Sequence, residues 1–352
     1  MEDIAGNVGI TAAALYRHFP NKYALFAECA NVMVDRLIEA VDEVPAEAAL
    51  TDVLAAITRV TVANRASGAV YRLQDRYLND PDRRGLHEKF ARVIGRVTDA
   101  MNREHPLPDE QLRANAALGA IGSITLHGTS IAQRRAEALL LAASTRVSAT
   151  DPSAGTGSAP LIELPAEPVP RTRRAEIVAA AIPLFERDGF ASVTNGRIAE
   201  AVGLVPSAIY RYFPGKADIL TEACLQAARL LSQAVNQNLR GKTDPRDAVV
   251  TLAATYVAYS FEHTALTSVA NAERVGLPAK LQRPVANAQR EHIAVWEQQL
   301  RSARPELNSR QARVLVQAGF GVVFEAGRKL KWQDDPHNRE FVAAMFVAAL
   351  GL

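Results

Sequence analysis

The chain lacks the residues and patterns that mark several large classes of protein. Its 352 residues include two cysteines, Cys29 and Cys224, too few for a disulfide framework or a metal cluster. No apolar run is long enough to cross a bilayer and no signal peptide follows Met1, so we expect a cytoplasmic protein without a membrane partner. Because the net charge is only +2, any contact with nucleic acid has to come from local basic residues.

The sequence also lacks the short motifs that indicate an enzyme. It contains no H-E-x-x-H, no G-x-S-x-G and no cluster of cysteine and histidine ligands. The glycine-rich triplet Gly155 to Gly157 lies in a stretch rich in proline and serine, with no strand pattern before it. We therefore predict no enzymatic activity, no cofactor and no metal site.

Helix-forming residues are abundant instead. Hydrophobic residues make up 48% of the chain and aromatic residues 6%, alanine is frequent, and alternating β-branched runs are scarce, which predicts an all-α protein. Helices are expected in the first half at 22–43, 48–66, 69–78, 82–103, 109–127 and 130–147. In the second half they are expected at 173–188, 195–201, 206–212, 216–239, 245–264, 267–275, 279–303, 309–330 and 338–350.

One stretch of the sequence occurs twice. Residues 3–25 and 197–219 match at a constant offset of 194, for example at Tyr16 and Tyr210 or at Lys22 and Lys216. A period this long indicates a duplicated domain rather than a solenoid. We predict a truncated DNA-binding unit at 1–44, a first helical regulatory and pairing domain at 45–147, and a disordered linker at 148–170. A complete DNA-binding unit at 171–220 and a second helical regulatory and pairing domain at 221–352 follow.

The second copy has the pattern of a helix-turn-helix unit. An apolar helix containing Phe185 ends near Gly189, a short helix follows Thr194, and Gly203 supplies the tight turn before a third helix. This arrangement places a helix in the DNA major groove. The pattern I-A-x-x-V-G-L-x-x-S-A-I-Y-R-Y-F-P-G-K, preceded by A-x-x-L-F, resembles the TetR family of bacterial repressors.

The resemblance implies a DNA-binding transcriptional regulator of the bacterial cytoplasm, associated with the nucleoid and released from its operator by a small-molecule effector. Exposed tyrosines and cations are expected to contact phosphates, and the start of the third helix to read bases, with Arg211 facing guanine. Thr194 and Thr11 are expected to cap helices at the same surface. The complete predicted DNA-binding set is Thr11, Tyr16, Arg17, His18, Lys22, Arg171, Arg173, Arg174, Thr194, Pro206, Ser207, Tyr210, Arg211, Tyr212 and Lys216.

Three features depart from the family pattern. Val205 stands where a Ser or Thr cap is expected, and Pro183 lies inside the first helix, where it should produce a kink. The first copy begins at Met1, which aligns with Asn195, so its leading helix is missing. Either the true start lies upstream, which we favour, or the first half has lost DNA binding and serves only as a pairing partner.

The resemblance also implies an effector pocket and a pairing face in the helices that follow. The helices at 309–330 and 338–350 are expected to pack with 109–127 and 130–147 as a four-helix bundle. One chain then presents two non-identical heads to an imperfect inverted repeat, and a homodimer is the alternative. A small-molecule-binding or scaffolding protein without operator binding is a second hypothesis. The expected pocket residues are Tyr256, Tyr259, Phe261, His263, Arg274, Trp296, Phe320 and Phe324.

Overall fold

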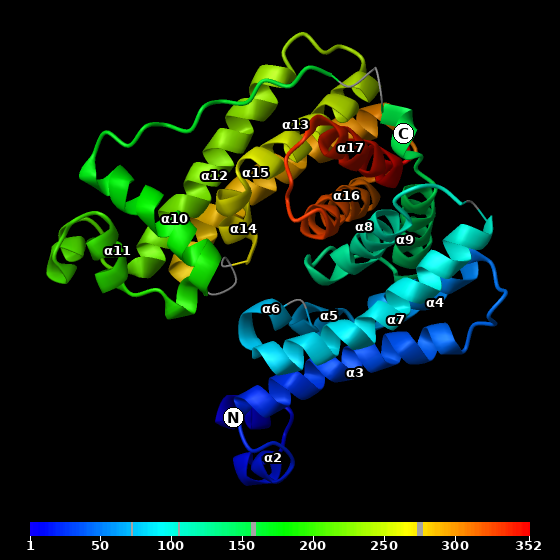
Figure 1. Ribbon diagram of the computed structural model, residues 1–352, viewed down its shortest axis with the longest axis horizontal. Helices are drawn as coiled ribbons and strands as arrows, with labels where there is room; N and C mark the ends of the chain where they lie inside the picture. Colours follow the sequence, from blue (N-terminus) through cyan, green and yellow to red (C-terminus); the bar gives the residue numbers. More distant parts are fainter. Residues whose placement is uncertain (72, 105, 156–159, 273–276) are drawn as a thin grey trace. The chain divides into compact units, whose positions relative to one another are not determined.

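The protein, described here from a computed structural model, is built from helices that form two compact units (Figure 1). The structure describes residues 1–71, 73–104, 106–155, 160–272 and 277–352. Every regular element in these ranges is a helix, which confirms the all-α prediction for the described residues. Unit 1 comprises residues 1–152, 317–329 and 348–351, and unit 2 comprises 153–316, 330–347 and 352.

Unit 1 begins with two short helices and continues into longer ones. Its elements are α1 (Glu2–Asn7), α2 (Ala12–His18), α3 (Lys22–Asp42), α4 (Leu50–Ala63), α5 (Arg65–Tyr71), α6 (Gln74–Tyr77), α7 (Asp80–Glu104), α8 (Glu110–Gly122), the 3-10 turn η1 (Ser123–Thr125) and α9 (Gln133–Ser148). The 3-10 turn η2 (Pro152–Gly155) follows at the boundary with unit 2.

The core of unit 1 is shared by α3, α4, α7 and α8, whose apolar faces bury residues such as Val34, Leu54 and Val97. The loop between α3 and α4 is fastened to α7. Arg96 donates hydrogen bonds to the carbonyl oxygens of Val44 at 2.9 Å and of Pro45 at 3.1 Å. Both carbonyl groups lie in this loop, beyond Asp42, the last residue of α3.

Residues from the far end of the chain complete unit 1. Gly119 of α8 lies so close to Gly321 that a Cβ atom added to either residue would collide with the other's carbonyl oxygen. Arg146 of α9 donates hydrogen bonds to the carbonyl oxygens of Ala348 at 2.7 Å and of Ala349 at 3.1 Å. The first half of the chain is therefore packed against residues 317–329 and 348–351, which belong to the same unit.

Unit 2 contains the second DNA-binding pattern and most of the later helices. Its elements are α10 (Arg173–Ser192), α11 (Asn195–Ala201), the 3-10 helix η3 (Pro206–Arg211), α12 (Lys216–Asn238), α13 (Pro245–Glu262), α14 (Thr264–Ala272) and α15 (Ala279–Ala303). Helix α16 (Ser309–Lys329) belongs to unit 2 up to Val316, and α17 (Pro336–Leu350) up to Val347. None of the described helices combines the length and apolar character that a membrane crossing needs.

Aromatic side chains fill the space between α13, α15 and α17. The rings of Trp296 and Phe346 stack with centroids 4.8 Å apart, and Tyr256 meets both rings edge-on. The indole nitrogen of Trp296 donates a hydrogen bond to Nε2 of His292 at 3.1 Å. Burial lowers the pKa of His292 to about 4, so this imidazole is neutral at pH 7 and free to accept that bond.

The segment expected to be a disordered linker differs from that expectation in its described parts. Helix α9 continues to Ser148, and residues on either side of Leu164 lie against unit 2. Asn238 donates to the carbonyl oxygen of Glu163 at 2.8 Å and accepts from its backbone N–H at 3.1 Å. Leu164 packs on the apolar core, and Glu167 lies 3.2 Å from Nδ1 of His263.

Two local expectations about the second DNA-binding pattern also change. The break in the helical backbone of α10 lies at Gly189, with φ 72° and ψ 150°, and not at the exposed Pro183. Only glycine adopts such torsion angles without strain. The third helix is the 3-10 helix η3, which has no side-chain cap at Val205.

Candidate nucleic-acid interface

The helix-turn-helix of unit 2 is held by a small apolar core. Ile198 of α11, Ile209 of η3 and Phe213 after it are fully buried against Ile177 and Phe185 of α10. Gly203 takes the left-handed conformation, φ 66°, between α11 and η3. The N–H of Leu204 donates a hydrogen bond to the carbonyl oxygen of Ala199 in α11 at 2.8 Å. The turn between the two helices is therefore closed by the backbone. We call residues 171–216 the second head.

The exposed face of the second head carries the residues expected to read bases. Pro206 and Ser207 at the start of η3 are exposed, and so is Arg211 at its end. Among the described residues, the guanidinium group of Arg211 has no hydrogen-bond or ion-pair partner. Tyr210 is 60% exposed, and its phenol oxygen accepts a hydrogen bond from Nδ2 of Asn195 at 3.1 Å.

Several cations expected at the DNA are instead engaged inside the second head. Lys216 donates hydrogen bonds from Nζ to the carbonyl oxygens of Phe190 at 2.7 Å, Ala191 at 3.0 Å and Val193 at 2.8 Å. Its ammonium group also lies 4.6 Å from the ring centroid of Phe190. A cation is favoured there because carbonyl groups accumulate at a helix C-terminus. Lys216 therefore fastens the end of α10 to the start of α12.

The two arginines at the start of α10 are engaged in the same way. Arg174 donates to the carbonyl oxygen of Tyr212 and stacks 3.9 Å from the ring centroid of Phe213. Arg173 donates to the carbonyl oxygen of Val202 at 3.2 Å and pairs with Glu176 at 2.6 Å. Both belong to α10. They close the head around its apolar core.

The remaining predicted residues of the second head divide between cap, core and solvent. The hydroxyl of Thr194 accepts the N–H of Arg197 at 3.2 Å, which confirms the expected cap of α11. Tyr212 is half-buried against the core. Arg171 is exposed and, within the part of the chain that the structure describes, has no polar partner.

The first head, residues 1–22, presents its predicted residues to solvent. The hydroxyl of Thr11 caps α2, as expected, by accepting a hydrogen bond from the N–H of Ala14 at 3.1 Å. Tyr16 is 52% exposed, and Arg17, His18 and Lys22 are exposed as well. Lys22, the counterpart of Lys216, has no polar partner among the described residues. The same motif residue thus has different surroundings in the two heads.

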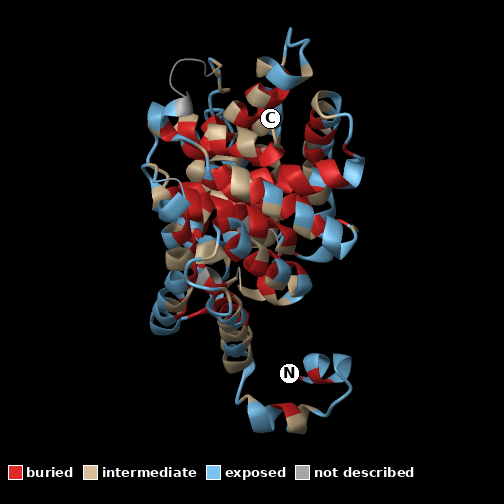
Figure 2. Ribbon diagram, turned by 90° about the vertical axis from the view of Figure 1, so that its right-hand side faces the viewer, coloured by how far each residue is buried: buried red, intermediate tan, exposed pale blue. Residues whose placement is uncertain are grey.

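The apolar core of the first head is much smaller than that of the second. Its buried members are Met1, Ala5 and Leu15. Ile4 is 38% exposed whereas its counterpart Ile198 is fully buried, because α10 covers the latter. Figure 2 shows the corresponding helices beside the N label, with mostly exposed and intermediate surface.

Sequence patterns missed two groups that shape the second head. Asn195 was not predicted to have a role, although it is the residue that contacts the phenol of Tyr210. Arg187 and Arg197 both bond to Asp188, and their hydrogen bonds hold the pKa of that carboxyl at about 2. Since charged residues on α10 and α11 have no fixed spacing in the motif, only the three-dimensional structure could place them together.

The described residues among those expected around an effector are divided between the two units. Tyr259, Phe261, His263 and Trp296 are buried in unit 2 with the half-buried Tyr256. Tyr259 donates to a carbonyl oxygen of α12 at 3.0 Å, and burial raises its pKa above the ordinary value. Phe320 and Phe324 belong to unit 1, and Arg274 lies outside the described residues.

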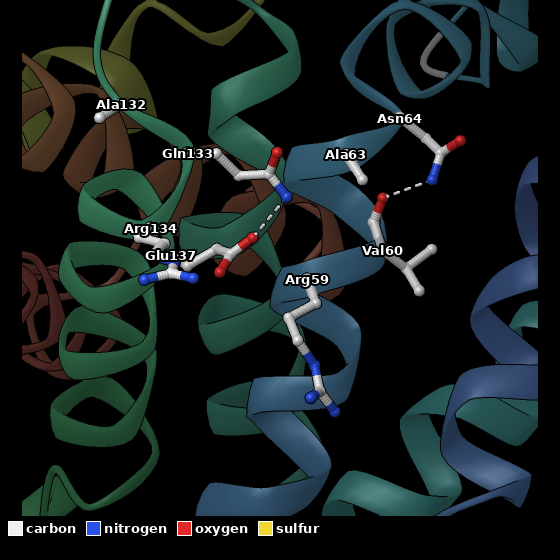
Figure 3. Close-up of a pocket in the computed structure, with 8 residues that line it drawn as sticks. All are labelled: Arg59, Val60, Ala63, Asn64, Ala132, Gln133, Arg134 and Glu137. Atoms are coloured by element: carbon white, nitrogen blue, oxygen red, sulfur yellow. Dashed lines mark hydrogen bonds between the residues drawn. The ribbon is translucent and has the colours of Figure 1, made fainter.

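Two hollows among the described residues are lined by side chains other than these aromatic residues. One, of about 710 Å³, lies in unit 1 along α4 and the start of α9 (Figure 3). Five of the eight residues that line it are polar or charged, and among them Gln133 donates to Glu137 at 2.9 Å. A second hollow, of about 350 Å³, lies over the later turns of α15.

Comparison with known proteins finds a similarity to one family in the segments of both heads. The family model for bacterial regulatory proteins of the tetR family matches residues 1–29 and 177–223. These are the segments in which the structure builds the two heads. Over these two segments, the chain is similar to bacterial regulatory proteins of the tetR family.

Individual curated proteins are also similar to part of this chain. The nucleoid occlusion factor SlmA of Haemophilus ducreyi is 27% identical over 111 residues, which cover 31% of this chain and 54% of that protein. SlmA of Actinobacillus pleuropneumoniae serotype 5b is 25% identical over 111 residues, with the same coverage. The chain thus spans about half the length of the curated relatives it matches.

Solved structures of regulators also resemble parts of the chain. A TetR-family transcriptional regulator from Bordetella parapertussis has a TM-score of 0.47 and 22% identity, over 51% of this chain and 95% of that one. A tetR-family regulatory protein from Rhodococcus RHA1 has a TM-score of 0.44 and 20% identity, over 51% and 95%.

Proposed function

We propose that the chain is a sequence-specific DNA-binding transcriptional regulator with two reading heads on one polypeptide. The observation that carries the proposal is the occurrence of the TetR-family segment at both 1–29 and 177–223, each folded as short helices joined by a left-handed glycine, Gly9 or Gly203. Exposed Arg17 and Arg211 occupy equivalent positions beside the exposed tyrosines of the two heads. Such groups suit base edges and phosphates.

The two halves of the chain pair with each other in this proposal, as two subunits would. Support comes from the contact of Gly119 with Gly321 and from the hydrogen bonds of Arg146 to the end of α17. Lys329 adds a hydrogen bond to Gln111 at 2.6 Å. Because small residues let helix backbones approach closely, these positions suit a tight helix pair. Effector-controlled release from DNA, acting as a repressor, is part of the proposal.

A selection experiment tests the function. The wild-type chain is incubated with random-sequence duplexes, and bound DNA is recovered and sequenced. We expect an imperfect inverted repeat whose half-site centres are about 34–36 Å apart, since Thr11-Ala12-Ala13-Ala14 differs from Val205-Pro206-Ser207-Ala208. A perfect inverted repeat contradicts two non-identical heads. Recovery of no common sequence favours a small-molecule-binding or scaffolding protein.

The salt dependence of binding provides a quantitative check. Four exposed cations of the heads, Arg17, Lys22, Arg171 and Arg211, have no polar partner among the described residues. If each neutralises one phosphate, the affinity falls about 150-fold between 50 and 200 mM salt. If Arg173, Arg174 and Lys216 also contacted phosphates, the affinity would fall about 6,000-fold over the same range of salt.

A further inference from the structure

The hydrogen bond between Asn195 and Tyr210 gives the second head a feature that the first head lacks. Asn195 is the first residue of α11, directly after the cap Thr194, and its side chain lies at the surface end of that helix. Its Nδ2 donates to the phenol oxygen of Tyr210 at 3.1 Å. The bond therefore connects the beginning of α11 to η3, across the turn that separates them.

The direction of this bond matters for what the phenol can do next. A phenol oxygen accepts one hydrogen bond while its own O–H donates another. Since the amide nitrogen supplies the donor here, the phenolic hydrogen of Tyr210 remains available to a phosphate oxygen. The accepted bond also polarises the phenol and strengthens its donation. Tyr210 is 60% exposed, so the residue is accessible to a DNA backbone.

The first head cannot form the equivalent bond. Tyr16 matches Tyr210 at the offset of 194, and at the same offset the residue matching Asn195 is Met1. A thioether has no donor hydrogen, and the side chain of Met1 is buried in the small core with Ala5. Among the described residues, the phenol of Tyr16 has no polar partner.

We infer that Asn195 is a positioning residue that fixes the phenol of Tyr210 for a hydrogen bond to a DNA phosphate in the second head. The inference rests on the proposed DNA-binding function. Holding the side chain in place before binding avoids part of the entropy lost when an exposed ring is immobilised at an interface, which corresponds to about a fivefold gain in affinity.

Binding constants of point variants test the inference. The probe is a fluorescein-labelled duplex recovered by the wild-type chain, titrated at several salt concentrations. We expect N195A to weaken binding about fivefold and Y210F about tenfold, because Y210F removes the bond to the phosphate itself. Neither variant removes a cation, so the slope of log affinity against log salt stays at its wild-type value.

A double-mutant cycle separates positioning from a merely structural role. In the Y210F background we expect N195A to have an effect of less than about twofold, since the group that it positions is already gone. In the Y16F background, the matched control in the first head, the full fivefold effect of N195A should persist. N195D should bind less tightly than N195A, because a carboxylate accepts the phenolic hydrogen and repels the phosphate.

Each result has a defined meaning. An equal loss from N195A with and without Y210F overturns the inference, and so does wild-type affinity in N195A. A reduced salt slope in N195A also overturns it, because that result indicates a disrupted head. If the wild-type chain recovers no duplex at all, the proposed function fails and the inference falls with it.

Discussion

Replacing each of the two matched lysines with methionine gives the sharpest contrast that the structure predicts. Lys22 and Lys216 occupy the same motif position, at the first residue of α3 and of α12. Lys22 is exposed and without a polar partner among the described residues. Lys216 donates to three carbonyl oxygens at 2.7, 3.0 and 2.8 Å. Methionine keeps most of the aliphatic chain and removes the ammonium group in both cases.

The two substitutions should therefore act on different quantities. A charged hydrogen-bond donor serving partly buried carbonyl groups is worth about 1.5–3 kcal/mol, so K216M should destabilise the second head by that amount. K22M should not destabilise the first head, since a cation at a helix N-terminus opposes the helix dipole. K22M should instead remove one phosphate contact and reduce the salt slope by about 0.9, whereas K216M leaves that slope unchanged.

Amide hydrogen exchange and salt-dependent DNA binding measure these two effects. In K216M, amides of α10 and α11 should exchange faster by a factor of about 10–100, in proportion to the lost free energy. In K22M, exchange in α1 and α2 should be unchanged. Equal exchange effects in the two variants, or a reduced salt slope in K216M, would refute the different roles that we assign to the lysines.

Four further substitutions test the packing of the units. G119A should destabilise unit 1 by about 1–3 kcal/mol because its Cβ would meet a backbone carbonyl oxygen of α16, whereas G85A, in the open part of α7, should stabilise it by about 0.5–1 kcal/mol in thermal unfolding. R113M should cost about 3 kcal/mol or more in urea unfolding, since the fully buried Arg113 serves three carbonyl oxygens. Burial lowers the pKa of His292 from 6.5 to about 4, so the unfolded chain binds a proton at a higher pH than the folded chain does. The free energy of unfolding should therefore be constant above pH 6.5 and fall by about 3 kcal/mol as the pH falls toward 4. Tryptophan fluorescence should report that loss, which H292Q should abolish.

Local sequence patterns were sufficient for most helices and for the plan of the heads. The predicted helix at 279–303 coincides with α15, and the one at 216–239 ends one residue beyond α12, because apolar periodicity and caps act over a few residues. The caps at Thr11 and Thr194 were readable for the same reason. The 3-10 form of η3 was not, since it differs from an α-helix in hydrogen-bond register and not in composition.

Contacts between distant segments were beyond the reach of those patterns. The cations Arg174 and Lys216 were expected at phosphates because the motif places them near DNA, yet carbonyl groups of the same head hold them. Which partner a long, flexible side chain takes depends on backbone groups 23 to 38 residues away. The approach of Gly119 to Gly321 depends in turn on how the whole chain folds back on itself. Neither the spacing of residues nor the composition predicts which distant segments come into contact.

The number of chains on one recovered duplex tests the central claim most directly. Native mass spectrometry or sedimentation of the complex at low protein excess gives that number without reference to any variant. If one polypeptide carries both reading heads, one chain should bind a duplex containing two half-sites, and a duplex with one half-site should bind much more weakly. Two chains on a duplex with two half-sites, each contributing one head, would contradict the account.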